Sequence, residues 1–213
     1  MIESEEQARA YVAQLCDVAA MDRLARFVAA LCAENVRQNL VAKPTLEIAW
    51  QRHIADSAQL LTYLEDVSAG PWLDLGTGAG LPGLVIAAMR PDLPVKLVES
   101  RRKRVDWLES MRLELGLANC EVIGSRLEMV ESFPSGVISA RAFAPLARLL
   151  DLSARFSTDD TVWLLPKGRS AAQELEDLPN RMRQMFHVEH SQTDSEAGII
   201  VGKLLRKGAK KKP

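Results

Sequence analysis

The chain has 213 residues, of which 47% are hydrophobic, so it is long enough for one sizeable domain with an appendage and can fill a core. The formal net charge is −1, so the total charge gives no argument for a nucleic-acid partner. Only local charged patches can indicate one. The three cysteines are far apart and in no metal-ligand spacing, and no apolar run is long enough to span a membrane. Acidic residues (Glu3, Glu5 and Glu6) stand where a signal peptide would be basic. We therefore expect a cytoplasmic protein with no metal site and no membrane partner.

Residues 1–66 contain no glycine and repeat their apolar side chains at helical spacing, as at Leu24 and Leu31. Pro44 interrupts the series, and Thr45 is placed to cap the helix that follows. We expect about three helices here, packed as an N-terminal cap.

From residue 70 onward, short apolar runs alternate with amphipathic segments, which is the pattern of βαβ units. The predicted strands are 71–75, 95–99, 120–123, 136–140 and 160–165, and the predicted helices between them are 81–89, 102–115 and 145–154. Two more β-like runs, 182–189 and 198–205, predict an antiparallel hairpin at one edge. The sequence thus predicts an α/β domain over residues 67–206, with a mostly parallel seven-stranded sheet flanked by helices. A basic tail, 207–213, is expected to be disordered.

The helix expected at 102–115 has clear boundaries. Ser100 is placed to cap its start, Leu108 and Met111 lie on its buried stripe, and Gly116 ends it where a left-handed residue is favoured.

The rest of the chain is arranged around residues 72–83. An apolar run that carries Asp74 breaks into a cluster of glycines just before a helical pattern begins; these are Gly76, Gly78, Gly80 and Gly83. Glycine permits positive φ angles and close approach, and a helix start offers unpaired N–H groups. This strand–turn–helix unit predicts a ligand-binding turn.

Two cofactors compete for this turn. Gly78-x-Gly80-x-x-Gly83 matches the dinucleotide fingerprint, with Glu99 following about twenty residues later, so an NAD-dependent oxidoreductase is one hypothesis. Asp74, inside the strand, favours S-adenosylmethionine, because a carboxylate can neutralise that cofactor's ammonium and sulfonium charges. In either case Glu99 can accept hydrogen bonds from ribose hydroxyls. A non-catalytic RNA- or ribosome-binding protein that keeps the cofactor fold is a third hypothesis.

Cations gather where strands end. Arg126, Arg141 and Lys167 each fall at or just past the carboxyl end of a predicted strand, and these ends share one rim of an open α/β sheet. Three cations near a cofactor favour a polyanionic substrate. Arg141 donates hydrogen bonds and accepts none, which suits a guanine edge or a phosphate, although a surface arginine paired with an acid is the alternative.

Three further polar residues are open to two interpretations. Glu128 lies where it can accept from an adenine amino group, or it favours the start of a helix by its charge. His53 and Asp56, three residues apart, either face the cofactor rim together or form a pair within their own helix.

These motifs resemble those of the 16S ribosomal RNA small-subunit methyltransferase G family, also called glucose-inhibited division protein B. The resemblance spans about residues 35–170 and is carried by Arg52-His53-Ile54-x-Asp56-Ser57, by the turn with its Leu81-Pro82-Gly83 ending, by Ser139-x-Arg141-Ala142-Phe143 and by Lys167-Gly168. It implies a Rossmann-like class I methyltransferase that uses S-adenosylmethionine to methylate N-7 of a guanine in the 530 loop of 16S rRNA. The partner implied is 16S rRNA or the small ribosomal subunit, and a monomer is favoured. In that family the cofactor is held at positions matching Gly76, Leu81, Leu127, Glu128 and Arg141.

This chemistry places modest demands on the site. Guanine N-7 already has an exposed lone pair, so no general base is expected and the task is positioning. We expect Arg141 to orient the site, and Arg126 and Lys167 to hold phosphates.

Overall fold

The computed structural model describes residues 1–64 and 70–205. Its seven strands form one sheet in the order β3-β2-β1-β4-β5-β7-β6. The strands are β1 (Trp72–Leu75), β2 (Val95–Val98), β3 (Cys120–Ile123), β4 (Val137–Ala140), β5 (Val162–Gly168), β6 (Phe186–His190) and β7 (Gly198–Gly202). β1 to β5 pair in parallel, and β7 runs antiparallel to both of its neighbours. The predicted mostly parallel sheet with a hairpin at its edge is confirmed.

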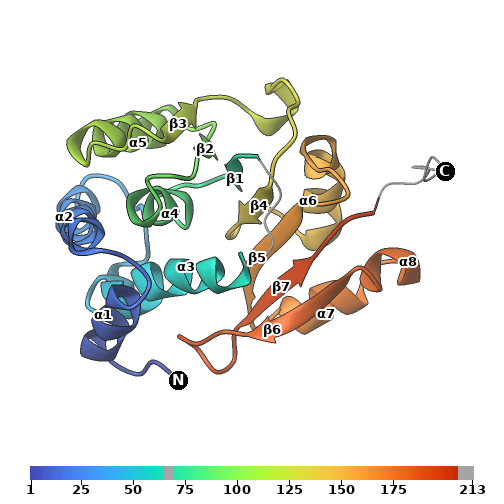
Figure 1. The fold of residues 1–213 in the computed structure, drawn as a ribbon, viewed down its shortest axis with the longest axis horizontal. Coiled ribbons are helices and arrows are strands. Elements are labelled where there is room, and N and C mark those ends of the chain that lie inside the picture. The colour runs from blue at the N-terminus through green and yellow to red at the C-terminus, as the bar shows by residue number, and fades with distance from the viewer. Residues whose placement is uncertain (65–69, 206–213) are drawn as a thin grey trace.

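The helices lie before the first strand and between the later ones (Figure 1). They are α1 (Glu5–Ala13), α2 (Val18–Glu34), α3 (Asp56–Ala58), α4 (Gly83–Met89), α5 (Arg102–Glu114), α6 (Leu146–Ser153), α7 (Ala171–Glu176) and α8 (Asn180–Arg183), with 3₁₀ turns η1 (Lys43–Leu46), η3 (Gln59–Tyr63), η4 (Leu127–Met129) and η5 (Ala154–Phe156) and the π-helix η2 (Trp50–Ala55). The two short helices α7 and α8 were not predicted, because each is too short to show a helical period. Over the described residues, no helix combines the length and apolarity needed to cross a membrane.

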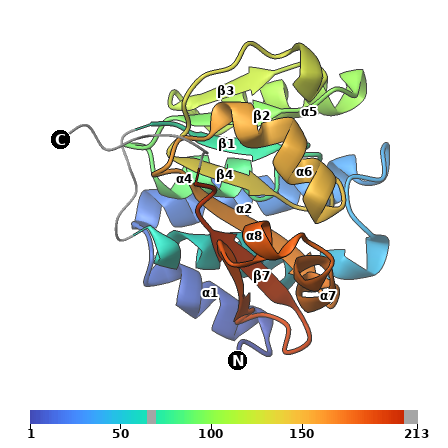
Figure 2. The ribbon, with the colours of Figure 1, turned by 90° about the vertical axis from the view of Figure 1, so that its right-hand side faces the viewer.

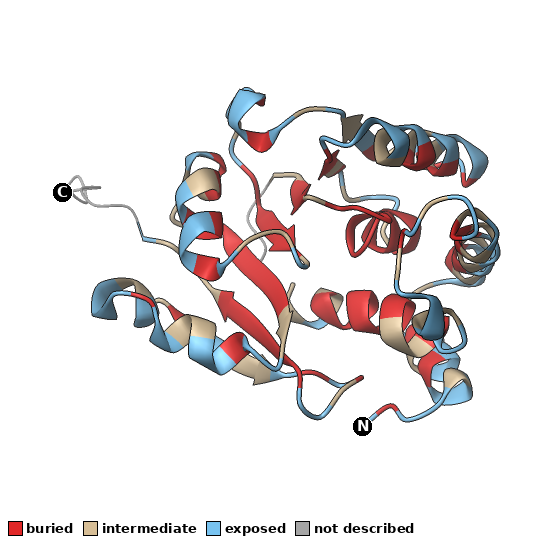
Figure 3. Ribbon diagram, turned by 180° about the vertical axis from the view of Figure 1, so that it is seen from behind, coloured by how far each residue is buried: buried red, intermediate tan, exposed pale blue. Residues whose placement is uncertain are grey.

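Helices cover both faces of the sheet (Figures 1 and 2). One core cluster joins α1 to α5 to one face, and a second joins α6, α7, η4 and η5 to the other. Alternate residues along a strand serve the two clusters, as Trp72 and Leu73 do in β1. The central strands are therefore buried along most of their length (Figure 3), as expected for a parallel sheet covered on both sides.

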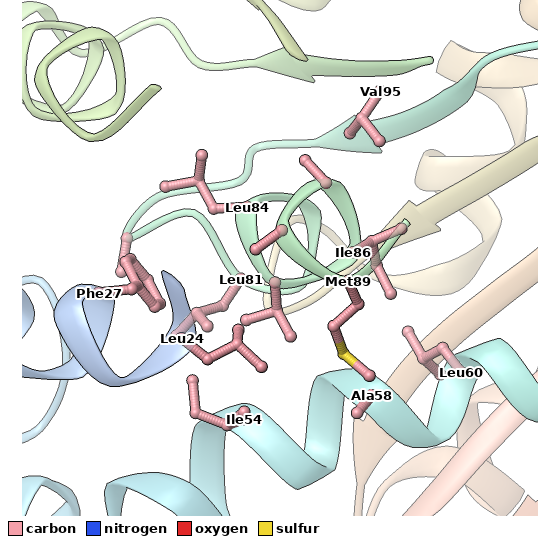
Figure 4. Close-up of a cluster of buried hydrophobic side chains, with 14 of the residues drawn as sticks. Leu24, Phe27, Ile54, Ala58, Leu60, Leu81, Leu84, Ile86, Met89 and Val95 are labelled. Atoms are coloured by element: carbon pink, nitrogen blue, oxygen red, sulfur yellow. The ribbon is translucent and has the colours of Figure 1, made fainter. Parts of the chain in front are cut away.

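The N-terminal cap shares a core with the sheet. Leu24 of α2, Ile54 of η2 and Ala58 of α3 pack in the same cluster as Leu84 and Met89 of α4, all of them buried (Figure 4). The boundary predicted between residues 66 and 67 and the tail at 207–213 lie outside the described residues.

Two predicted helix caps are wrong, and one predicted helix end is confirmed. α5 begins after Arg101, which makes no side-chain cap, and Ser100 instead gives its backbone N–H to Glu99. Thr45 lies inside η1, where its hydroxyl donates to the Ala42 carbonyl oxygen 2.6 Å away. Gly116 has φ +66° at the end of α5, as predicted.

Candidate active site

The glycine turn after β1 needs glycine for conformational and spatial reasons. Gly76 and Gly78 have φ +62° and +60°, which other residues rarely adopt. At Gly83, the first residue of α4, an added Cβ would meet the side chains of Leu97 and Asp74. Leu81, expected at the cofactor, is 2% exposed and packs in the core cluster that holds α2 (Figure 4). The turn thus presents backbone, while its apolar side chain anchors it.

Asp74 lies beneath this turn and is fully buried. One carboxylate oxygen accepts from the Gly83 N–H at 3.0 Å, and the other accepts from the Ser139 hydroxyl at 2.7 Å. Ser139 in turn accepts from the Trp72 indole N–H at 2.7 Å. Burial raises the pKa of Asp74 to about 6, although hydrogen bonds from Ser139 and Gly83 act against the rise. The carboxylate therefore ties β1, β4 and the start of α4 together.

Glu99, just past β2, gathers three backbone N–H groups. One of its oxygens accepts from Ser100 and Arg101, each at 2.8 Å, and the other accepts from Gly78 at 3.1 Å. The carboxylate is 5% exposed, yet it lines a cavity of about 220 Å³, the turn cavity, together with Gly76 and Leu127. Its position fits the predicted acceptor for ribose hydroxyls, because the oxygen that bonds Gly78 has acceptor capacity left.

Two more cavities open on the same rim. The rim cavity, about 480 Å³, is lined by Arg126, Leu127, Glu128 and Arg148 among others. The cap cavity, about 590 Å³, lies where η2 faces the ends of β4 and β5, and Arg141 lines it. Most of the predicted site residues thus line three neighbouring cavities at one edge of the sheet. The exceptions are buried and line none of the three: Asp74, Gly78, Gly80 and Leu81.

Arg141 reaches from the end of β4 to the N-terminal cap. Its guanidinium donates to the Asp56 carboxylate at 3.2 Å, and lies 3.4 Å from Nδ1 of His53 and 3.5 Å from the Arg52 carbonyl oxygen. The alternative of a surface arginine paired with an acid is right about the pairing and wrong about the surface, since the Arg141 side chain is only 21% exposed and that of its acid, Asp56, is 6% exposed. His53 and Asp56 both contact Arg141, which favours the first of their two interpretations, and of the two Asp56 alone lines one of the three cavities. They lie on or directly after η2, and π-helical turns are frequent at functional sites.

His53 is held neutral beside this arginine. Burial and the nearby charges of Arg141 and Arg52 lower the pKa of His53 to about 3. The Thr45 hydroxyl already donates to Ala42, so Thr45 accepts from Nε2 of His53 at 2.8 Å. Nδ1 is then free to accept from Arg141. The hairpin adds support that the sequence did not reveal, because Thr193 donates to Asp56 at 3.0 Å.

The other two predicted cations have different surroundings. Arg126 is exposed on the rim, as a phosphate ligand would be. Lys167 is only 7% exposed, and its ammonium donates to the Glu174 carboxylate and the Ala144 carbonyl oxygen, both at 2.8 Å. The expected contact of Lys167 with a phosphate is therefore replaced by a bond inside the wall of the cap cavity. Glu128 is exposed beside Arg126 and lines the rim cavity.

The family model for rRNA small subunit methyltransferase G matches residues 20–198 of this chain. The chain is similar to ribosomal RNA small subunit methyltransferase G of Erythrobacter litoralis, with 62% identity over 203 residues, 95% of this chain and 98% of the relative. It is also similar to the protein of that name from Novosphingobium aromaticivorans, with 57% identity over 205 residues, 95% of this chain and 89% of the relative.

Solved structures agree on the fold. A SAM-dependent methyltransferase from Aquifex aeolicus superposes with a TM-score of 0.54 at 16% identity, over 71% of this chain and 90% of that one. MtNAS, solved in complex with S-adenosylmethionine, gives 0.54 at 14% identity, over 93% and 77%. The predicted Rossmann-like fold of an S-adenosylmethionine-dependent methyltransferase is confirmed, and with it the choice between the two cofactors that the glycine turn left open. From the family match and these identities, the chain belongs to the rRNA small subunit methyltransferase G family.

Proposed function

We propose that this protein transfers a methyl group from S-adenosylmethionine to N-7 of a guanine in the 530 loop of 16S rRNA. One observation carries the choice of acceptor: Arg141 faces the cap cavity, and both carboxylates among the described residues lining it are bound to cations. Burial alone would raise the pKa of Glu174, but hydrogen bonds from Lys167 and Ser170 outweigh it and leave that pKa lowered. Glu174 is therefore a weak base, and Asp56 is already engaged by Arg141. They suit an acceptor that, like guanine N-7, already presents a lone pair.

The turn cavity supports the cofactor assignment. S-adenosylmethionine, when bound, supplies a methyl group activated on a sulfonium. Gly76 leaves backbone bare for its amino-acid tail, Glu99 faces its ribose, and Leu127 and Glu128 flank the place for its adenine. In place of the direct contact expected from the sequence, we propose that Asp74 acts through the turn, because both of its oxygens bond within the protein.

Arg141 has the donors to orient the acceptor. An arginine carries five N–H groups, and its contacts with Asp56, His53 and Arg52 use three of them. The other two N–H groups have no partner among the described residues, so they can donate to guanine O-6 or to the cofactor carboxylate. Arg126, exposed on the rim, is proposed to contact an RNA phosphate.

The direct test uses purified protein, methyl-labelled S-adenosylmethionine, and small ribosomal subunits or deproteinised 16S rRNA from cells that lack this enzyme. Nucleoside mass spectrometry should find the label in 7-methylguanosine, and fragment mapping should place it in the 530 loop. Label at another position refutes the proposed acceptor. RNA binding without transfer supports the non-catalytic alternative.

The role of Arg141 is tested by replacing it with Ala and with Lys. We expect R141A to lower kcat about 100-fold, the usual cost of removing one preorganised donor. Because R141A also leaves the buried Asp56 without this partner, the double variant R141A/D56N serves as the control for folding. Unchanged turnover in a folded R141A protein contradicts the assignment.

A further inference from the structure

Phe143 occupies the junction of the three cavities. Of the described residues, it is the one that lines the turn cavity, the rim cavity and the cap cavity alike. Its neighbours Ala142 and Ala144 each line two of them. The half-buried ring therefore forms the wall between the proposed cofactor site and the proposed acceptor site.

The ring stands edge-on against the glycine turn. A Cβ placed on Gly76 would lie nearest to Cδ2 of Phe143, with Cε2 at 3.1 Å and Cγ at 3.2 Å. Cε2 and Cγ are the two ring atoms bonded to Cδ2. They lie nearly equally far from the added Cβ, and clearly farther than Cδ2 does, which is the geometry of an approach in the plane of the ring. An approach over the face would bring those two atoms closer. Contact through an edge keeps both faces of the ring clear of the glycine turn, while the ring also packs against the core cluster that holds α6.

The backbone holds the ring in this position. Ala142 has φ +54°, the one positive φ of a non-glycine residue among the described residues. A side chain in this conformation costs roughly 1–2 kcal/mol, and such strain is concentrated at functional sites. On either side of it, Arg141 reaches to Asp56 and Phe143 reaches to Gly76. The short loop thus sends a cation and an aromatic ring to different sides of the same junction.

We propose that Phe143 is the stacking platform for the acceptor purine in the cap cavity, a positioning role that rests on the proposed function. In that reaction the N-7 lone pair forms the new carbon–nitrogen bond, and the methyl–sulfur bond breaks with its electron pair returning to sulfur. No proton is released, so the positive charge passes from sulfur to the purine. The face of an aromatic ring attracts a cation. Every base can stack on an aromatic ring. Phe143 stabilises the purine further as methylation proceeds, because the purine then becomes positively charged.

This role predicts a particular kinetic signature. Phosphate contacts dominate the affinity of a protein for RNA, whereas the position of one base is settled after the RNA has bound. Loss of the platform lowers the fraction of bound complexes whose purine sits in the cavity. The effect should appear in kcat, with little change in KM for the RNA.

The test compares Phe143→Leu, which keeps apolar bulk without an aromatic face, with Phe143→Tyr, which keeps the face. Phe133→Leu makes the same change at another half-buried ring, which packs on Phe156 and lines none of the three cavities. For each variant we would measure kcat and KM with small ribosomal subunits, the Kd for S-adenosylhomocysteine by calorimetry, and the urea unfolding midpoint.

We expect F143L to lower kcat about 10- to 100-fold, in line with the usual worth of base stacking, while KM and the Kd for S-adenosylhomocysteine stay within about threefold. F143Y should recover most of the kcat that F143L loses, because it restores the aromatic face, and F133L should retain wild-type kcat within about threefold. Wild-type kcat in F143L overturns the proposal. A fall in cofactor affinity that accounts for the whole loss also overturns it, because Phe143 would then serve only the turn cavity. Failure of the proposed function is distinguished by the wild-type protein, which would then form no 7-methylguanosine in 16S rRNA.

Discussion

Replacement of Asp74 by Asn tests the buried carboxylate beneath the glycine turn. Its pKa rises from 3.8 to about 6 on folding, because burial disfavours the charged form. Because the folded-state pKa is raised, the stability that the protonated Asp74 side chain contributes is fully present below pH 3.8. That contribution is lost as the pH rises through 6. At about 1.4 kcal/mol for each tenfold change in an ionisation constant, the complete loss is about 3 kcal/mol. About half of it, on the order of 1 kcal/mol, develops between pH 5 and pH 8.

The amide introduced by D74N has no charge to desolvate, but it offers one acceptor oxygen where Asp74 uses two. Keeping the bond to Gly83 leaves the Ser139 hydroxyl without its acceptor, at a cost of about 1 kcal/mol. We expect D74N to be more stable than the wild type by about 2 kcal/mol at pH 8, and this advantage to shrink by on the order of 1 kcal/mol at pH 5.

Urea unfolding of both proteins at intervals from pH 5 to pH 8 measures this difference, since all other titrating groups cancel. Asp92→Asn is a matched control, because Asp92 is on the surface and Arg90 lowers its pKa, so its stability effect should have the opposite sign. A difference between D74N and wild type that does not change with pH refutes the reasoning. S-adenosylhomocysteine should bind D74N within about threefold of wild type, since neither oxygen is available to the cofactor.

Two further changes probe the turn. Glu99→Gln should weaken binding of S-adenosylhomocysteine at least about tenfold in calorimetry, because an amide N–H₂ would replace an oxygen that now accepts from a backbone N–H; unchanged affinity would exclude Glu99 from the ribose site. Gly83→Ala should lower the free energy of unfolding by about 1–3 kcal/mol, because its Cβ needs the space of Leu97 and Asp74. If G83A and the wild type have the same urea unfolding midpoint, the close approach of Gly83 to Leu97 and Asp74 does not constrain the turn.

Helix caps were the least predictable local features. Ser100 and Thr45 are residue types that favour caps, and each is adjacent to a predicted helix start. Ser100 gives its backbone N–H to the adjacent Glu99 and makes no side-chain cap, whereas the Thr45 hydroxyl meets His53 of η2. For Thr45, local propensity could not weigh a partner that the fold brings from another element.

The sequence by itself determined the sheet, the placement of the glycine turn and the rim on which Glu99 and Arg141 lie. These follow from local rules, since apolar runs set strands, positive φ selects glycine, and parallel strands bring their carboxyl ends to one edge. Only the tertiary structure decided what each side chain touches there. Arg141 meets Asp56 across 85 positions, and Asp56 meets Thr193 across 137, so packing rather than sequence pattern fixed the acceptor side of the site. Lys167 shows the same limit of sequence pattern. Its ammonium is buried because α7, a later helix, supplies the carboxylate of Glu174, and the strand end alone does not indicate that partner.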